Sequence, residues 1–185
     1  MTKVIIIHGF DGSPNGGWRP WLMGELAKLG VYAVALPMPD PTHPVCSEWV
    51  GEISRHSAYV KGDRIYLVGH SLGVSAILRY LEGPDASEIS GAVLVSGPVA
   101  MTKNDYVNEF LQPAFDFEKI LSKCRRFGVI HGDDDPNVPL SDARTLSREL
   151  HCPLNVIENG GHLNGVSGWL ALPQCLEALD GMMEE

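Results

Sequence analysis

Hydrophobic residues along this chain gather in short runs that alternate with longer amphipathic stretches. Most of the runs are unbroken rather than interleaved with polar residues, which is typical of strands covered on both faces of a sheet. They predict six strands, at Val4–His8, Val31–Leu36, Arg64–Val68, Ala92–Ser96, Phe127–His131 and Leu154–Glu158.

The stretches between these runs carry apolar residues at helical spacing. They predict helices at Trp18–Leu29, Val45–Val60, Leu72–Leu81, Ser141–Leu150 and Pro173–Gly181. Strands and helices that alternate along a chain favour a mainly parallel sheet with helices on both faces, joined by right-handed crossovers. The expected fold class is therefore α/β, and the length fits a single domain over residues 1–185.

One segment, residues 98–120, departs from this alternation. Its large apolar residues, among them Met101, Tyr106 and Phe110, show no clean period, and the segment is long for a plain connection. Two interpretations remain open: a short lid over a site at the end of the sheet, or a helix and loop that simply cover it.

Composition excludes several classes of function. Hydrophobic residues make up 44% of the chain and charged residues 20%, which is typical of globular proteins. The formal net charge of -9 argues against a nucleic-acid partner, because polyanion binding needs a basic patch. No stretch approaches transmembrane length, and the first apolar run is too short for a signal-peptide core. We expect no membrane partner and a cytoplasmic location, and the sequence does not indicate an oligomeric state.

The four cysteines are widely scattered, at Cys46, Cys124, Cys152 and Cys175, and form no C-x-x-C pair. This spacing fits neither a zinc site nor a disulfide framework, so reduced, mostly buried thiols are expected. The sequence predicts no metal and no cofactor.

The pentapeptide Gly69-His70-Ser71-Leu72-Gly73 lies between a predicted strand and a predicted helix. A G-x-S-x-G sequence in that context is typical of a nucleophile elbow, a tight turn that holds a strained serine at its apex. Glycines fit there because a Cβ would collide with neighbouring backbone. The pentapeptide alone fits a purely structural turn equally well, so the interpretation of Ser71 as a nucleophile depends on partners elsewhere.

Three consecutive acids, Asp133, Asp134 and Asp135, follow the fifth predicted strand, at the sheet edge where open α/β sheets place their chemistry. In the hydrolase pattern the carboxylate lies three residues before a valine–proline pair, which selects Asp135. Asp133 and Asp134 then cap turn backbone. A magnesium-binding cluster is the competing interpretation, but no phosphate-cradling glycine loop accompanies it.

His162 follows the last predicted strand and two glycines, which predict a mobile turn with room for the imidazole to swing. The order Ser, Asp, His along the chain is that of α/β-hydrolases, so His162 is the predicted base. His8, His70 and His131 are expected to be local packing and hydrogen-bonding groups.

The glycine-rich loop after the first strand predicts an oxyanion hole, which needs two converging N–H donors. The candidates are the backbone N–H groups of Phe10 and Leu72. A ligand-free turn is the alternative, and it weakens once Ser71 is considered beside it. Phe10, Asp11 and Trp18 are the candidate substrate-binding residues, although tryptophans at helical spacing more often belong to a core.

Together these motifs resemble the small α/β-hydrolase family of serine hydrolases of the retinoblastoma-binding protein 9 and YdeN-like type. The resemblance covers nearly the whole chain and includes His8-Gly9, Gly12-Ser13-Pro14, Trp18-Arg19-Pro20-Trp21-Leu22, the pentapeptide around Ser71, Asp135 to Pro139, Gly161-His162 and Ser167-Gly168. It implies a compact α/β-hydrolase fold that lacks the first antiparallel strands. It also implies a Ser-His-Asp hydrolase acting on small esters or amides.

We therefore expect a metal-independent serine hydrolase that cleaves small carboxylic esters or amides through an acyl-enzyme on Ser71. His162 would act as base and Asp135 would orient it. Because the base must be neutral, activity should rise with pH near the histidine reference value of about 6.5. Two alternatives stay open, since a fold does not fix a function: another reaction class such as acyl transfer or lyase chemistry, and a catalytically silent binding protein.

Overall fold

The computed structural model describes residues 1–58 and 62–184 of the chain. Within these residues, six strands form one sheet in which every neighbouring pair is parallel. The spatial order is β2-β1-β3-β4-β5-β6. The strands are β1 (Thr2–Ile7), β2 (Tyr32–Ala35), β3 (Arg64–His70), β4 (Gly91–Val95), β5 (Phe127–Gly132) and β6 (Leu154–Ile157).

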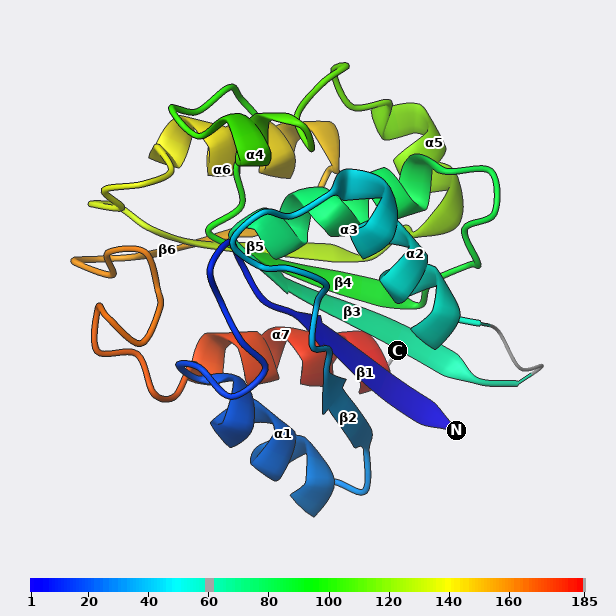
Figure 1. The fold of residues 1–185 in the computed structure, drawn as a ribbon. Coiled ribbons are helices and arrows are strands. Elements are labelled where there is room, and N and C mark those ends of the chain that lie inside the picture. The colour runs from blue at the N-terminus through cyan, green and yellow to red at the C-terminus, as the bar shows by residue number, and fades with distance from the viewer. Residues whose placement is uncertain (59–61, 185) are drawn as a thin grey trace.

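Seven helices accompany the sheet in the described residues. They are α1 (Arg19–Lys28), α2 (Cys46–His56), α3 (Leu72–Glu82), α4 (Asp105–Asn108), α5 (Phe117–Lys123), α6 (Leu140–Glu149) and α7 (Pro173–Glu184). Figure 1 shows α1 and α7 on one face of the sheet and the other helices on the opposite face. The predicted α/β class, with a parallel sheet between two helical layers, is confirmed.

Burial on both faces explains why the strands read as unbroken apolar runs. In β1, Ile5 and Ile7 pack into the core under α2 and α3, whereas Val4 and Ile6 pack into the core under α1 and α7. None of these four side chains is exposed. Successive side chains of a strand point to opposite faces, and here both faces are buried. Consecutive residues of the strand are therefore all apolar.

The observed elements overlap the predicted ones and differ mainly at their ends. The helix predicted at Val45–Val60 ends at His56, and residues 59 and 60 lie outside the described residues. The helix predicted at Pro173–Gly181 continues to Glu184. Among the described helices, none combines the length and apolar character needed to span a membrane.

The irregular segment, residues 98–120, holds α4 and the first part of α5. The side chain of Asn104 caps α4 by accepting hydrogen bonds from the backbone of its first turn. Asp142 of α6 accepts hydrogen bonds from the N–H groups of Val99 and Ala100, at 2.9 and 3.1 Å, and fastens the start of the segment. The segment is thus a covering loop with short helices, and its movement as a lid stays a prediction.

Candidate active site

Ser71 occupies the turn between β3 and α3 with φ +54° and ψ −123°, outside the conformations that a serine ordinarily adopts. The flanking glycines make this turn possible. A Cβ on Gly69 would lie 2.8 Å from the backbone N of Val74, and one on Gly73 would lie 2.4 Å from the backbone O of Ile7. The expected collision with backbone is therefore confirmed at both glycines.

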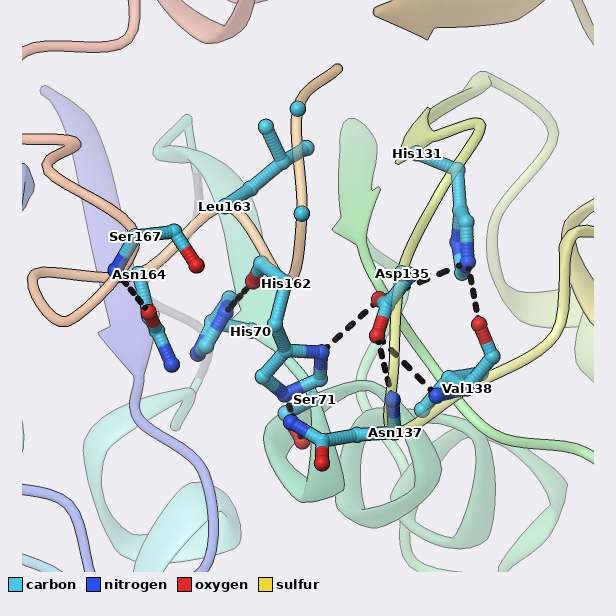
Figure 2. A network of polar contacts seen from close by, with 12 residues as sticks. His70, Ser71, His131, Asp135, Asn137, Val138, His162, Leu163, Asn164 and Ser167 are labelled. Carbon is cyan, nitrogen blue, oxygen red and sulfur yellow. Dashed lines mark hydrogen bonds and ion pairs between the residues drawn. The ribbon is translucent and has the colours of Figure 1, made fainter.

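The structure brings Ser71, His162 and Asp135 into one hydrogen-bonded chain (Figure 2). Nε2 of His162 lies 3.0 Å from Oγ of Ser71, and Nδ1 of the same ring lies 2.8 Å from Oδ2 of Asp135. The Asp135 side chain is fully buried and that of His162 nearly so. This geometry suits a serine hydroxyl that gives its proton to an imidazole oriented by a carboxylate.

The second oxygen of Asp135 is held by backbone. Oδ1 accepts hydrogen bonds from the N–H groups of Asn137 and Val138, at 2.8 and 3.1 Å. Burial acts to raise the pKa of this carboxyl, but the hydrogen bond and charge of His162, together with the two backbone donors, outweigh burial and leave the pKa below its ordinary value. Asp135 is therefore ionised at neutral pH and keeps the proton of His162 on Nδ1.

The other two acids of the cluster fix the turn that carries His162. Asp133 accepts a hydrogen bond from the N–H of Asn159 at 2.8 Å, and Asp134 accepts one from the N–H of Gly161 at 2.7 Å. The predicted role in capping turn backbone is confirmed. The turn that they cap, however, lies after β6 and not within their own loop.

The glycines before His162 allow close packing of backbone against backbone, and the mobility expected of this turn stays a prediction. A Cβ on Gly132 would lie 2.2 Å from the backbone O of Gly161, and one on Gly160 would lie 3.0 Å from the Cα of Gly132. The indole N–H of Trp169 also donates to the carbonyl of Gly160, at 2.7 Å. The turns after β5 and β6 therefore press backbone against backbone, and only glycine leaves room for that contact.

Trp18 corrects the expectation that it contacts substrate. Its side chain is fully buried in the core beneath α1 and α7, and it lines neither of the cavities beside Ser71. Its indole N–H donates to the carbonyl of Leu163 at 2.8 Å, directly after the predicted base. Trp18 thus supports the turn that carries His162 from below.

The remaining buried histidines serve as hydrogen-bonding groups, as expected. Nδ1 of His8 bonds to the carbonyl of Gly9 at 2.8 Å, and Nε2 of His131 bonds to the carbonyl of Val138 at 2.9 Å. Nε2 of His70 lies 2.9 Å from the carbonyl of His162. Burial, with a smaller contribution from the charge of His162, lowers the pKa of His70 to about 3, so this ring is neutral and its Nε2–H donates.

Two cavities meet at Ser71. The larger has a volume of about 720 Å³ and is walled by residues of the covering segment and of the loop after Asp135. The smaller, about 340 Å³, lies along the glycine-rich loop after β1 and includes Asp11. Phe10, Ser71 and His162 line both cavities. Two of the three candidate substrate-binding residues, Phe10 and Asp11, therefore line a cavity beside Ser71, and their contact with substrate stays a prediction.

The loop after β1 lies directly against the serine, since a Cβ on Gly9 would come within 2.8 Å of the Cβ of Ser71. In the part of the chain that the structure describes, neither the N–H of Phe10 nor that of Leu72 donates a hydrogen bond to the protein. The two predicted oxyanion-hole donors therefore have no protein partner within the described residues, and their role stays a prediction.

Sequence reasoning overlooked two side chains at the site. Asn164 lines both cavities, and Arg19 lines the smaller one although only 5% of its surface is exposed. Proximity to His162 along the chain could have drawn attention to Asn164. Nothing in the local sequence distinguishes Arg19 from a solvated cation at the start of a helix.

All four cysteines are free thiols. Across residues 1–58 and 62–184, no three histidine, cysteine, aspartate or glutamate side chains are grouped as metal ligands would be. The three acids after β5 point instead to backbone donors and to His162.

Comparison with known proteins adds independent evidence. A family described as serine hydrolase matches residues 4–181. YdeN of Bacillus subtilis (strain 168) is 36% identical over 182 residues, which are 97% of this chain and 95% of that protein. The serine hydrolase RBBP9 of Rattus norvegicus is 26% identical over 168 residues, 87% of each chain.

Solved structures of related proteins also match this chain. The crystal structure of the ydeN gene product from B. subtilis matches with a TM-score of 0.94 and 33% identity, over 100% of both chains. Est1E from Butyrivibrio proteoclasticus matches with a TM-score of 0.70 over 97% of this chain and 88% of that chain. At 18% identity, this second likeness concerns the fold alone.

Proposed function

Since the chain belongs to the serine hydrolase family, and is therefore an enzyme of the hydrolase class, we propose that it cleaves small carboxylic esters or amides through an acyl-enzyme on Ser71. The observation that carries the proposal is the hydrogen-bonded chain from the Ser71 hydroxyl through His162 to Asp135. Its three members come from loops after β3, β6 and β5, and each contributes the group that acyl transfer needs at that place.

In the first half of the reaction, Oγ of Ser71 attacks the carbonyl carbon while its proton passes to Nε2 of His162. The N–H groups of Phe10 and Leu72 stabilise the negative charge that develops on the carbonyl oxygen. His162 then gives the proton to the leaving oxygen or nitrogen, and the acyl group stays on Ser71 as an ester.

In the second half, water enters beside the acyl group and loses a proton to Nε2 of His162. The resulting attack regenerates a tetrahedral species at the same two N–H donors. Its collapse returns the proton to Oγ of Ser71 and releases the carboxylic acid. Throughout both halves, Asp135 keeps the Nδ1 proton in place and stabilises the charged imidazole.

Hydrogen bonds to the turn that carries His162 support this cycle by fixing the position of the imidazole relative to Ser71. His70, Asp134 and Trp18 each bond to backbone within one residue of His162. A rigid base is useful because small displacements of reacting groups lower rates steeply. The volumes beside Ser71, about 720 and 340 Å³, favour small-molecule substrates.

The test is hydrolysis of a panel of p-nitrophenyl esters and aminoacyl amides by the wild type and by Ser71→Ala. We expect turnover in the wild type and its near-complete loss in Ser71→Ala. The matched control is Ser122→Ala on α5, whose hydroxyl bonds within its own helix. Labelling by a fluorophosphonate probe at Ser71 gives a second readout. Wild-type rates in Ser71→Ala would remove the serine from the mechanism, and absence of both turnover and labelling would indicate a silent binding protein.

A further inference from the structure

Arg19 is the first residue of α1, and its guanidinium reaches the smaller cavity that Ser71 and His162 also line. Only 5% of its surface is exposed. Its Nε–H donates to the carbonyl of Ser13 at 3.0 Å. The backbone of Gly16 leaves space for the charged end, since a Cβ there would lie 2.6 Å from Nη2. The loop is therefore shaped around a buried cation.

This cation lacks a counter-charge within the described residues. No carboxylate in residues 1–58 and 62–184 lies within 4.0 Å of the guanidinium of Arg19. Burial lowers its pKa to about 10, so the group stays charged at neutral pH. The guanidinium carbon lies 5.9 Å from the centre of the Trp18 ring, which attracts the cation but carries no opposite charge. A buried cation without an anionic partner is unfavourable, and an anion in the cavity would compensate it.

The neighbouring titratable groups do not supply that charge. His8 and His70 both have lowered pKa values, chiefly because they are buried and in part because of the positive charge of Arg19. Both rings are therefore neutral. Asp11 lines the same cavity but is exposed and forms no ion pair with Arg19. Within the described residues only Nε of Arg19 donates to the protein, so the Nη groups are left without a protein partner in a residue that lines the cavity beside Ser71.

We propose that Arg19 binds a carboxylate of the substrate in the smaller cavity while the scissile carbonyl lies at Ser71. The inference rests on the proposed function and names its substrate class: esters or amides that carry a second, ionised carboxyl group. A planar guanidinium matches the two oxygens of a carboxylate. The single cation beside the acidic Asp11 suits one negative charge better than the two of a phosphate monoester.

The net charge of the chain makes a local cation necessary for such a substrate. At a formal charge of -9, the protein as a whole repels anions, so only a charge placed in the cavity can favour them. Charge-assisted hydrogen bonds to a carboxylate from a buried arginine are worth about 10- to 100-fold in kcat/KM. That is the preference expected for an anionic substrate over its neutral counterpart.

The experiment compares matched esters in the intact protein. One pair places the carboxylate on the leaving group, as para-acetoxybenzoate against para-acetoxybenzamide. The other places it on the acyl group, as mono-p-nitrophenyl adipate against p-nitrophenyl hexanoate. The readout is the ratio of kcat/KM for the anionic member of each pair to that for the neutral member. A substitution that slows both members equally leaves this ratio unchanged. We expect the wild type to prefer the anionic member of at least one pair by about 10-fold or more.

Variants separate binding from a structural role. Arg19→Gln should lower the ratio toward one, mainly through KM, and Arg19→Lys should retain part of it. Asp11→Asn should raise the same ratio, because it removes a negative charge from the cavity. If Arg19 only supports the loop through Ser13, its substitution would slow both members of a pair equally, and the inference would be overturned.

The wild type alone can refute the inference even where Arg19 variants fold poorly, whereas loss of the preference in Arg19→Gln distinguishes Arg19 from Lys103 of the larger cavity. Ser71-dependent hydrolysis with no preference for either anionic ester overturns the carboxylate site and leaves the proposed function intact. Failure to hydrolyse any of the four esters overturns the proposed function and this inference with it.

Discussion

Replacing Asp135 by asparagine changes one atom type at the centre of the site. In the wild type, Oδ1 accepts from the backbone N–H groups of Asn137 and Val138, and Oδ2 accepts from Nδ1 of His162. The asparagine keeps its carbonyl oxygen on the two backbone donors, so its NH₂ group faces His162. An NH₂ group donates, and Nδ1 must then accept, which moves the ring proton to Nε2.

The magnitude follows from that tautomer. With a proton on Nε2, His162 cannot accept from the Ser71 hydroxyl 3.0 Å away. Where a triad aspartate is replaced in this way, kcat falls about 10,000-fold. At about 1.36 kcal/mol per factor of ten, the barrier rises by about 5.4 kcal/mol. Catalysis that remains would come from the oxyanion donors and substrate binding.

The assay is release of p-nitrophenol from p-nitrophenyl acetate, with thermal unfolding to verify that the variant is folded. Asp134→Asn is the matched control, because its amide oxygen can still accept from the N–H of Gly161 and it touches no ring nitrogen of His162. We expect at most a few-fold effect there. A loss below about 10-fold in Asp135→Asn, or an equal loss in both variants, would refute the tautomer argument.

Three further predictions concern packing and pH. Gly73→Ala places a methyl group 2.4 Å from the backbone O of Ile7 and should lower the free energy of unfolding, measured in urea, by about 1–3 kcal/mol or more. The control is Gly24→Ala in α1, where no atom lies within 4 Å of the new methyl group and the free energy of unfolding should rise by about 0.5–1 kcal/mol. Equal effects of the two substitutions would contradict the steric argument. The folded pKa of His70 lies far below the unfolded value, so wild-type stability should fall as pH drops from about 6.5 toward 4. In His70→Gln, urea unfolding at several pH values should show a slope shallower by about 1.4 kcal/mol per pH unit, and an unchanged slope would exclude His70 as its source. Trp18→Phe removes the donor to Leu163, so kcat should fall while KM stays near the wild-type value, and a change confined to KM would restore Trp18 as a substrate contact.

The sequence carried enough information to predict the layered sheet and the meeting of the three triad residues. The apolar run from Val4 to Ile7 reflects a strand covered on both sides. Ser71, Asp135 and His162 each follow a separate strand, and in a parallel sheet the ends of the strands share one edge. The convergence of these residues was therefore a consequence of topology that local patterns could reveal.

Other features depended on contacts between distant segments, which local patterns do not encode. Trp18 has the same helical spacing whether its ring faces a cavity or the core, and only the packing of α1 against α7 decides between them. The sequence Gly160-Gly161 predicts a flexible turn, yet a Cβ on Gly160 would lie 3.0 Å from the Cα of Gly132, and one on Gly161 would lie 2.9 Å from Oγ of Ser167. Arg19 belonged to a motif of the family resemblance, but its place at the site was not predicted, because its burial arises from contacts with the loop that contains Ser13 and Gly16.

The proposed triad and one part of the wall of the larger cavity, residues 98–104, are attached to the scaffold at separate places. Residues 98–104 reach that wall from the end of β4 and are fastened to α6 by Asp142, whereas the catalytic loops are braced through β3, β5 and the tryptophans of the opposite face. Exchange of side chains within residues 98–104 would therefore change which molecules fit the cavity without altering the hydrogen bonds of Ser71, His162 and Asp135. Substitutions in this segment, whether natural or engineered, are therefore expected to change substrate selectivity while the reaction mechanism stays the same.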